Sequence, residues 1–72
     1  METATVGKPG VLDARSLVGT VRRFGRTGPM YEITGVGNAT PDGDVLLRIS
    51  VLLSGEKLDY PFLQAIRDPQ VD

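Results

Sequence analysis

The arginines of the run R-R-F-G-R at residues 22–26 are the side chains best suited to chemistry, and Tyr31 follows close behind them. Guanidinium groups beside an exposed aromatic ring can hold phosphates while the ring stacks on a base. Arginine and tyrosine are also the residues that dominate the energies of protein interfaces. The alternative is structural: the arginines line the solvated end of a strand, and the rings of Phe24 and Tyr31 belong to the core.

Other kinds of chemistry lack the residues they need. The chain has no cysteine and no histidine, which removes thiolate nucleophiles, the commonest general base and the commonest zinc ligands. Asn38, Asp42 and Asp44 are spaced like the oxygen ligands of a calcium loop, but no acidic residue between Asp44 and Glu56 completes such a site. We therefore expect no enzyme activity, no cofactor and no metal.

The length of the chain sets a further limit. A chain of 72 residues buries only about 60% of its unfolded surface, which leaves no room for both a substantial core and a deep active-site cavity. The N-terminus lacks the basic flank and apolar run of a signal peptide. The longest mainly apolar stretch, Val45–Leu53, is far short of the ~20 residues that span a membrane. These features indicate a cytoplasmic binding module with no membrane contact.

Charge is divided unevenly along the chain. Residues 1–36 carry five basic and three acidic side chains, whereas residues 37–72 carry three basic and six acidic ones. Such a division favours a surface with a basic part and an acidic part. The isoelectric point near 5.2 is low for a dedicated nucleic-acid binder, for which about 9 or above is typical.

The first half of the chain predicts a leader and two strands. Residues 1–15 contain two glycines and a proline with few apolar side chains, so we expect a flexible leader followed by a domain at 16–72. Leu17–Phe24 and Met30–Val36 are rich in β-branched and aromatic residues, which favour strands. Glycine and proline between them, and again after Val36, are typical of turns.

The third strand has the clearest pattern. Five apolar side chains alternate at a period of two and predict one buried face: Val45, Leu47, Ile49, Val51 and Leu53. The opposite face is only half polar because it carries Leu46 and Leu52. These two leucines predict a second contact, which is either the protein's own leader and helix or a partner.

The last third predicts a hairpin and a short helix. Ser54-Gly55 is a two-residue turn that leads into a fourth strand, Glu56–Tyr60. Pro61 suits the first position of a helix, and Asp68-Pro69 ends it. Three apolar residues at helical spacing are expected to cap the open end of the sheet: Phe62, Leu63 and Ile66. The whole predicts a mostly β fold, a small antiparallel SH3-like, partly open barrel of four to five strands with a short C-terminal helix.

Parts of the chain resemble a small bacterial family of unknown function. The resemblance rests on G-T-V-R-R-F-G from Gly19, Y-E-I from Tyr31, S-G-E-K-L-D-Y-P from Ser54 and A-I-R-D-P from Ala65. It implies an origin in mobile, plasmid-like or phage-associated loci, where antitoxins and phage-encoded inhibitors are common. It supplies no catalytic residues.

We expect a non-enzymatic protein–protein interaction module that binds and restrains a larger effector protein, in the manner of an antitoxin or a phage-encoded inhibitor. One alternative is a nucleic-acid-binding barrel that uses the arginines at 22, 23 and 26. Another is a self-assembling structural protein, for example a homodimer. The residues expected to contact the partner are Arg22, Arg23, Arg26, Tyr31, Leu46 and Leu52.

Overall fold

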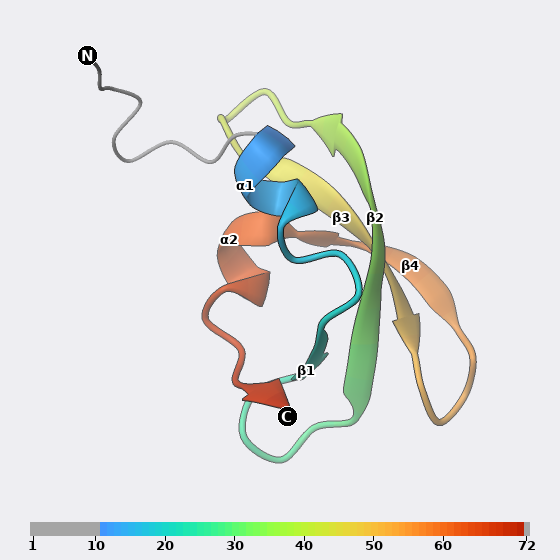
Figure 1. Ribbon diagram of the computed structural model, residues 1–72. Helices are drawn as coiled ribbons and strands as arrows, with labels where there is room; N and C mark the ends of the chain where they lie inside the picture. Colours follow the sequence, from blue (N-terminus) through green and yellow to red (C-terminus); the bar gives the residue numbers. More distant parts are fainter. Residues whose placement is uncertain (1–10, 72) are drawn as a thin grey trace.

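Alternating apolar residues build a five-stranded antiparallel sheet, which two short helices accompany (Figure 1). A computed structural model describes residues 11–71. The elements are α1 (Val11–Arg15), β1 (Val21–Arg23), β2 (Met30–Ala39), β3 (Val45–Val51), β4 (Lys57–Pro61), α2 (Phe62–Ala65) and β5 (Gln70–Val71). The strand order is β4-β3-β2-β1-β5, and every pairing is antiparallel.

The sheet curls because the chain returns from one of its edges to the other. After β4, on one edge, α2 crosses to the opposite side and β5 pairs with β1. Both helices lie on the same side of the curved sheet (Figure 1). This order, with a helical turn between the last two strands, is that of an SH3-like barrel left partly open, so the predicted fold class is confirmed.

The core lies between the concave face of the sheet and the helices. Its buried members come from α1, β2, β3 and α2, and they are Ala14, Tyr31, Ile33, Val45, Leu47, Ile49, Phe62 and Ala65. The alternation predicted for the third strand is confirmed from Val45 to Val51. It is wrong at Leu53, which is 93% exposed.

Leu53 is exposed because β3 ends earlier than predicted. The N–H of Val51 donates to the carbonyl of Glu56 over 2.8 Å, and the N–H of Gly55 donates to the carbonyl of Val51 over 2.7 Å. These bonds close a loop over residues 52–55, in which Gly55 has a φ of 74° that only glycine adopts easily. The predicted two-residue hairpin is therefore wrong, and Leu52 and Leu53 lie in the loop.

Two strand boundaries also differ from the prediction. β1 is shorter, because Leu17 and Thr20 belong to turns whose N–H groups donate to Ala14 and Leu17. β2 is longer than predicted and extends to Ala39. Its pairing with β3 shifts register twice, and such bulges strengthen the local twist that closes a small sheet.

The folded part of the chain begins upstream of the predicted boundary at residue 16. Ala14 is fully buried, and α1 packs against β2 and β3. The leader prediction is therefore incorrect for residues 11–15, while its first ten residues lie outside the described part of the chain. Neither α1 nor α2, the helices of residues 11–71, is long and apolar enough to cross a membrane.

The C-terminal helix lies in the predicted segment but is shorter at both ends and covers less of the core. Pro61, with a φ of −64°, precedes α2, and the chain leaves the helix before Asp68. Phe62 is buried, whereas Leu63 and Ile66 are 41% and 47% exposed. The expectation that all three cap the open end is wrong, because a helix of four residues turns only one side toward the sheet.

Candidate interaction surface

A buried carboxylate joins the two ends of the domain. Asp68 is only 5% exposed. Its Oδ2 accepts hydrogen bonds from the hydroxyls of Tyr31 (2.7 Å) and Tyr60 (2.9 Å). Its Oδ1 accepts one from the backbone N–H of Gly25 (3.1 Å). Three donors converge on one side chain, which is what a buried carboxylate needs in place of water.

Arg22 reinforces the same segment from β1. The side chain is buried, and its Nη1 donates to the carbonyl oxygens of Asp68 (3.0 Å) and Ala65 (3.3 Å). These acceptors lie in the last turn of α2 and just beyond it, where carbonyls lack helical partners. The guanidinium of Arg22 therefore holds the backbone after α2 against β1.

Three aromatic rings pack beneath this network. The ring of Phe24 lies 4.4 Å from that of Tyr31 and 5.2 Å from that of Tyr60, and the two tyrosine rings are 5.3 Å apart, measured between centroids. The pairs with Tyr60 are edge-to-face, an arrangement that the ring quadrupoles favour. The rings of this trio thus belong to the fold and its core.

The two tyrosines act as hydrogen-bond donors throughout the physiological pH range. Burial, together with the hydrogen bond to Asp68, raises the pKa of Tyr60 to about 12. The same causes raise the pKa of Tyr31 still further above its ordinary value. A phenol with so high a pKa is a poor base and a poor nucleophile at neutral pH. The network is consequently suited to fixing structure.

The loop between β1 and β2 is fixed at both ends. Gly25 has a φ of 64° and bonds to Asp68, while Gly28 donates its N–H to the carbonyl of Phe24 over 3.0 Å. A Cβ on Gly28 would collide with that carbonyl oxygen. Nη1 of Arg23 donates to the carbonyl of Gly28 over 3.1 Å. Arg26, between the two glycines, is exposed on a loop of defined shape.

The loop that carries Arg26 is bonded to the segment that follows α2. Because Gly25 is hydrogen-bonded to Asp68, Arg26 and Arg67 each adjoin a member of that bonded pair. Both arginines are exposed. We call the following set the basic–apolar surface: Arg23, Arg26, Leu63, Ile66 and Arg67.

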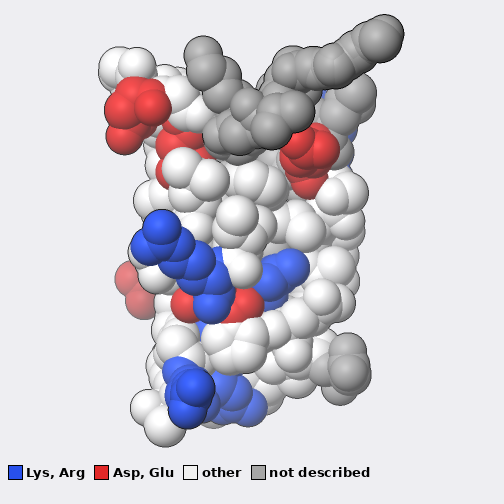
Figure 2. All heavy atoms as spheres, turned by 90° about the vertical axis from the view of Figure 1, so that its left-hand side faces the viewer, with Lys and Arg blue, Asp and Glu red and all other residues white. Residues whose placement is uncertain are grey.

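The charges on the helix side of the molecule are separated. Figure 2 shows Lys and Arg atoms gathered over the lower half of this side, around one acidic group, with most acidic atoms above them. The basic half corresponds to the end formed by β1, its following loop and the turn after α2. Arg67 joins it from the part of the chain that is acidic overall. The basic and acidic regions of this surface therefore do not coincide with the first and second halves of the sequence.

The structure distributes the six predicted contact residues among different places. Arg22 and Tyr31 are buried and bind the Asp68 segment, so their side chains are not available to a partner. Arg23 and Arg26 belong to the basic–apolar surface.

The two leucines among the six lie at opposite ends of β3. Leu52 donates its N–H to the carbonyl of Met30 over 3.0 Å, and Met30 pairs with Arg23, so Leu52 lies near the basic end. Leu46 lies six residues earlier, ~20 Å away along an extended chain, and does not share a patch with Leu52.

The sequence does not indicate the hydrogen bonds of Asp68 to Tyr31, Tyr60 and Gly25, nor the exposure of Leu63 and Ile66. The position of Asp68 directly before Pro69 predicts only that this residue ends the helix. Its partners Tyr31 and Gly25 lie 37 and 43 residues away, and no local pattern indicates such contacts. The apolar spacing of Leu63 and Ile66 with Phe62 suggested burial for all three.

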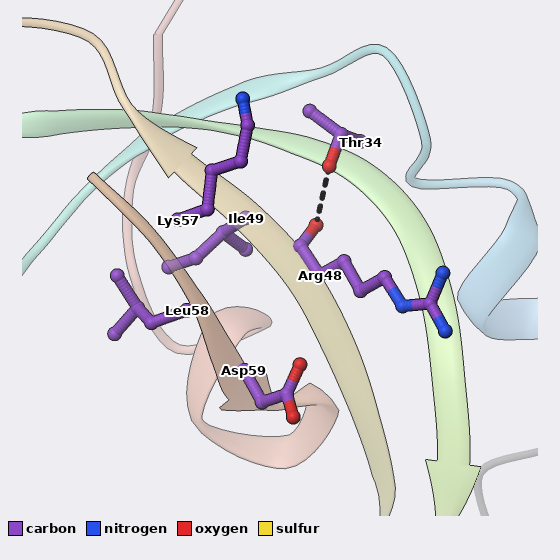
Figure 3. A pocket seen from close by; sticks show the side chains of 6 residues that line it. All are labelled: Thr34, Arg48, Ile49, Lys57, Leu58 and Asp59. Atoms are coloured by element: carbon purple, nitrogen blue, oxygen red, sulfur yellow. Dashed lines mark hydrogen bonds between the residues drawn. The ribbon is translucent and has the colours of Figure 1, made fainter. Parts of the chain in front are cut away.

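A shallow hollow of about 330 Å³ lies where β2, β3 and β4 run side by side. Figure 3 shows its lining, which comes from Thr34, Arg48, Ile49, Lys57, Leu58 and Asp59. The hydroxyl of Thr34 donates to the carbonyl of Arg48 over 3.1 Å. Charges of both signs line the hollow, so it has no single-sign field to attract a charged ligand. Within residues 11–71, no group of three or more acidic side chains is placed to hold a metal ion.

Comparison with known proteins places the chain among relatives of unknown function. The profile of DUF5397, a family of unknown function, matches residues 5–72. A protein of Haemophilus influenzae (strain ATCC 51907 / DSM 11121 / KW20 / Rd), described as uncharacterised, is 39% identical over 54 residues, which cover 75% of this chain and 86% of that protein. The residues that match the family profile include α1 and all five strands of the sheet.

Proposed function

Since the chain belongs to the DUF5397 family, whose function is unknown, we propose from the geometry that it is a non-enzymatic, cytoplasmic module that binds and restrains a larger protein. The observation that carries this proposal is the basic–apolar surface. Arg26 follows Gly25 and Arg67 precedes Asp68, the two residues that are hydrogen-bonded to each other, and α2, just before Arg67, carries the exposed side chains of Leu63 and Ile66.

The composition of this surface supports a protein partner. Arginine next to exposed aliphatic side chains is the combination that anchors interfaces, because the apolar groups exclude water from around the charge. The loop that carries Arg26 is bonded to Asp68 and to Arg23, so little freedom is lost on binding. The partner should offer an acidic surface around an apolar depression.

The proposed restraint of an effector rests on the size of the molecule. A chain of 72 residues has little interior besides its core, so occupying another protein's surface is the action open to it. An antitoxin or a phage-encoded inhibitor works in this way. Complementary charge would also speed the encounter with an acidic effector.

The test is affinity capture from host cells with matched charge variants. Tagged wild type, Arg26→Glu and Arg67→Glu are compared with Arg15→Glu, which makes the same charge change at an exposed position on α1. We expect one protein to be captured by wild type and by Arg15→Glu, and binding to weaken by more than about tenfold, or about 1.4 kcal/mol, in the other two.

Two further measurements make this test decisive. Circular dichroism should show all variants to be folded, because the side chains of Arg26 and Arg67 are exposed and substitutions at such sites change stability little. The captured protein's own activity, measured with and without the purified chain, tests the restraint. Equal capture by all four proteins would move the interface away from the basic–apolar surface.

Nucleic acid is the second candidate partner. The observation that favours it is that Arg26 and Arg67 are both exposed and each adjoins a member of the bonded pair Gly25 and Asp68. The aromatic ring expected to stack on a base is not available, because Tyr31 is fully buried. Binding would therefore rest on phosphate contacts, whose affinity falls steeply with salt. A titration of single- and double-stranded oligonucleotides at low and moderate salt distinguishes the two partners.

A further inference from the structure

β4 leaves one complete edge of the sheet open. It is the outermost strand in the order β4-β3-β2-β1-β5, and Lys57, Leu58 and Asp59 along it are all exposed. Leu58 is on the core side of the sheet, opposite Ile49, yet 37% of it remains exposed. Its exposure follows from the absence of a neighbouring strand beyond β4 in the described sheet.

The hydrogen-bond pattern shows which backbone groups of β4 face outward. Glu56 accepts a bond from the N–H of Val51, so its backbone faces β3. Backbone groups alternate in direction along an antiparallel strand. Leu58 therefore also faces β3, whereas the N–H and carbonyl groups of Lys57 and Asp59 face the open edge. Within residues 11–71 these outward groups bond to no other loop or turn.

The charges on this edge are complementary to themselves. An antiparallel strand centred on Leu58 of a second copy sets Lys57 opposite Asp59 of that copy, and Asp59 opposite its Lys57. Both are outward-facing positions, so each pair can exchange two N–H···O bonds. Opposite charges directly across such a pair add stability. We propose that β4 pairs with β4 of a second copy in this register, which gives a twofold dimer with a continuous ten-stranded sheet.

The neighbouring strand supports this register. Asp59 already faces Arg48 across the β3–β4 ladder, whereas Lys57 faces the uncharged Ser50. Pairing would give Asp59 a basic neighbour and Lys57 an acidic one. Figure 3 shows Arg48, Lys57 and Asp59 around the same hollow at this edge of the sheet.

The competing register is unfavourable. Centring the pair on Asp59 would set two carboxylates opposite each other, which is destabilising. It would also set Lys57 opposite Pro61, which has no N–H to donate. Only the register centred on Leu58 satisfies both charge and hydrogen bonding, and it brings the two exposed Leu58 side chains together.

The test is a charge swap followed by mixing. Lys57→Asp places acid opposite acid in a homodimer, and Asp59→Lys places lysine opposite lysine, so each variant alone should lose at least about tenfold in dimer affinity. When the two variants are mixed, every facing pair becomes opposite in charge, and a heterodimer should form. Arg15→Asp, an equal charge change away from β4, should dimerise like wild type.

Sedimentation equilibrium measures the outcome. An interface limited to one short strand belongs to the small class, below about 1,200 Å², so we expect a dissociation constant between about 10 µM and about 1 mM. A wild-type protein that stays monomeric at about 1 mM, or mixed variants that stay monomeric, would overturn the proposal. Dimerisation that persists in both single variants would show that another surface is used.

Discussion

The Asp68 network and the β4 edge contain the same kinds of residue in opposite situations. In the network, Arg22, Tyr31 and Asp68 are enclosed. Nη1 of Arg22 donates to backbone carbonyls and the hydroxyl of Tyr31 donates to Asp68, while Nε of Arg22 is buried without a hydrogen-bond partner among the described residues. At the edge, Lys57 and Asp59 are exposed, and their outward backbone groups bond to no other loop or turn of the described chain. Polar residues in the first region determine the fold, whereas those in the second are free to determine association. Residue type alone does not distinguish the two roles.

Removing the carboxylate of the network should have the largest effect on stability. Asp68→Ala deprives the hydroxyls of Tyr31 and Tyr60 and the N–H of Gly25 of their acceptor. We expect a loss of about 3–5 kcal/mol in the free energy of unfolding, the usual result of breaking a buried charged network. Urea denaturation measures it.

Asp68→Asn is the matched control for that experiment, because the amide keeps the size and one acceptor oxygen. It should lose less stability than Asp68→Ala. If both variants were as stable as wild type, the network would have no structural role. The equivalent change at the edge, Asp59→Ala, should leave monomer stability within about 0.5 kcal/mol, as is usual for surface sites.

Ile49→Ala tests the apolar core beneath both regions. Ile49 is buried at the centre of β3, so truncation leaves a cavity and should cost about 2–5 kcal/mol. A small domain has little more stability than this, and the variant should be largely unfolded in thermal melts followed by circular dichroism. A melting curve like that of wild type would contradict the assignment of the buried face.

The tyrosines give a pH test of the network. Their pKa values are raised in the folded state, to about 12 for Tyr60 and higher for Tyr31, against about 10 in unfolded chains. The folded state therefore keeps its protons, and this contribution to stability is complete below about pH 10 and is lost as the pH rises through the folded pKa. Since the chain has only two tyrosines, near-ultraviolet absorbance of phenolate reports on both.

We expect no phenolate signal in the native protein at about pH 10.5, and a strong signal at the same pH in urea. Tyr60→Phe should leave a single native transition at still higher pH. A native titration centred near pH 10 would show that the hydroxyls do not bind Asp68.

The smallest effect is expected at Leu53. It continues the alternation of β3 in the sequence, but it lies exposed in the loop. Leu53→Ala should change the free energy of unfolding by less than about 0.5 kcal/mol. Urea denaturation of Leu53→Ala and Ile49→Ala under the same conditions compares a loop position with a strand position from the same alternating sequence. A loss above about 2 kcal/mol would mean that Leu53 is buried in solution.

Local sequence patterns predicted the features that depend on neighbouring residues alone. The alternation from Val45 to Val51 located β3, and Pro61 located the start of α2. The predicted burial of Leu53 and Ile66 is wrong, and the two errors have a related cause. Apolar periodicity indicates that an element has an apolar face, but it does not indicate where the neighbouring element stops covering that face. The end of β3 depends on the bonds that Val51 makes to Glu56 and Gly55.

The candidate site was predicted only in part. The cluster of arginines was recognised, and Arg26 is exposed at the loop as a partner-binding residue must be. The enclosure of Arg22 and Tyr31 could not be seen, because it depends on Asp68, far away in sequence. Long-range hydrogen bonds of this kind have no periodicity, so a single sequence does not display them.

The long sequence separation between Asp68 and its hydrogen-bond partners has a consequence for synthesis. The bonds that close the barrel join residues 22–31 to residues 65–69, over separations of 37 to 46 residues, and β5 pairs with β1 only after them. On the ribosome, the sheet from β1 to β4 is made first and has neither its central carboxylate nor its last strand. The nascent domain therefore has to remain unclosed until residues 65–71 leave the exit tunnel.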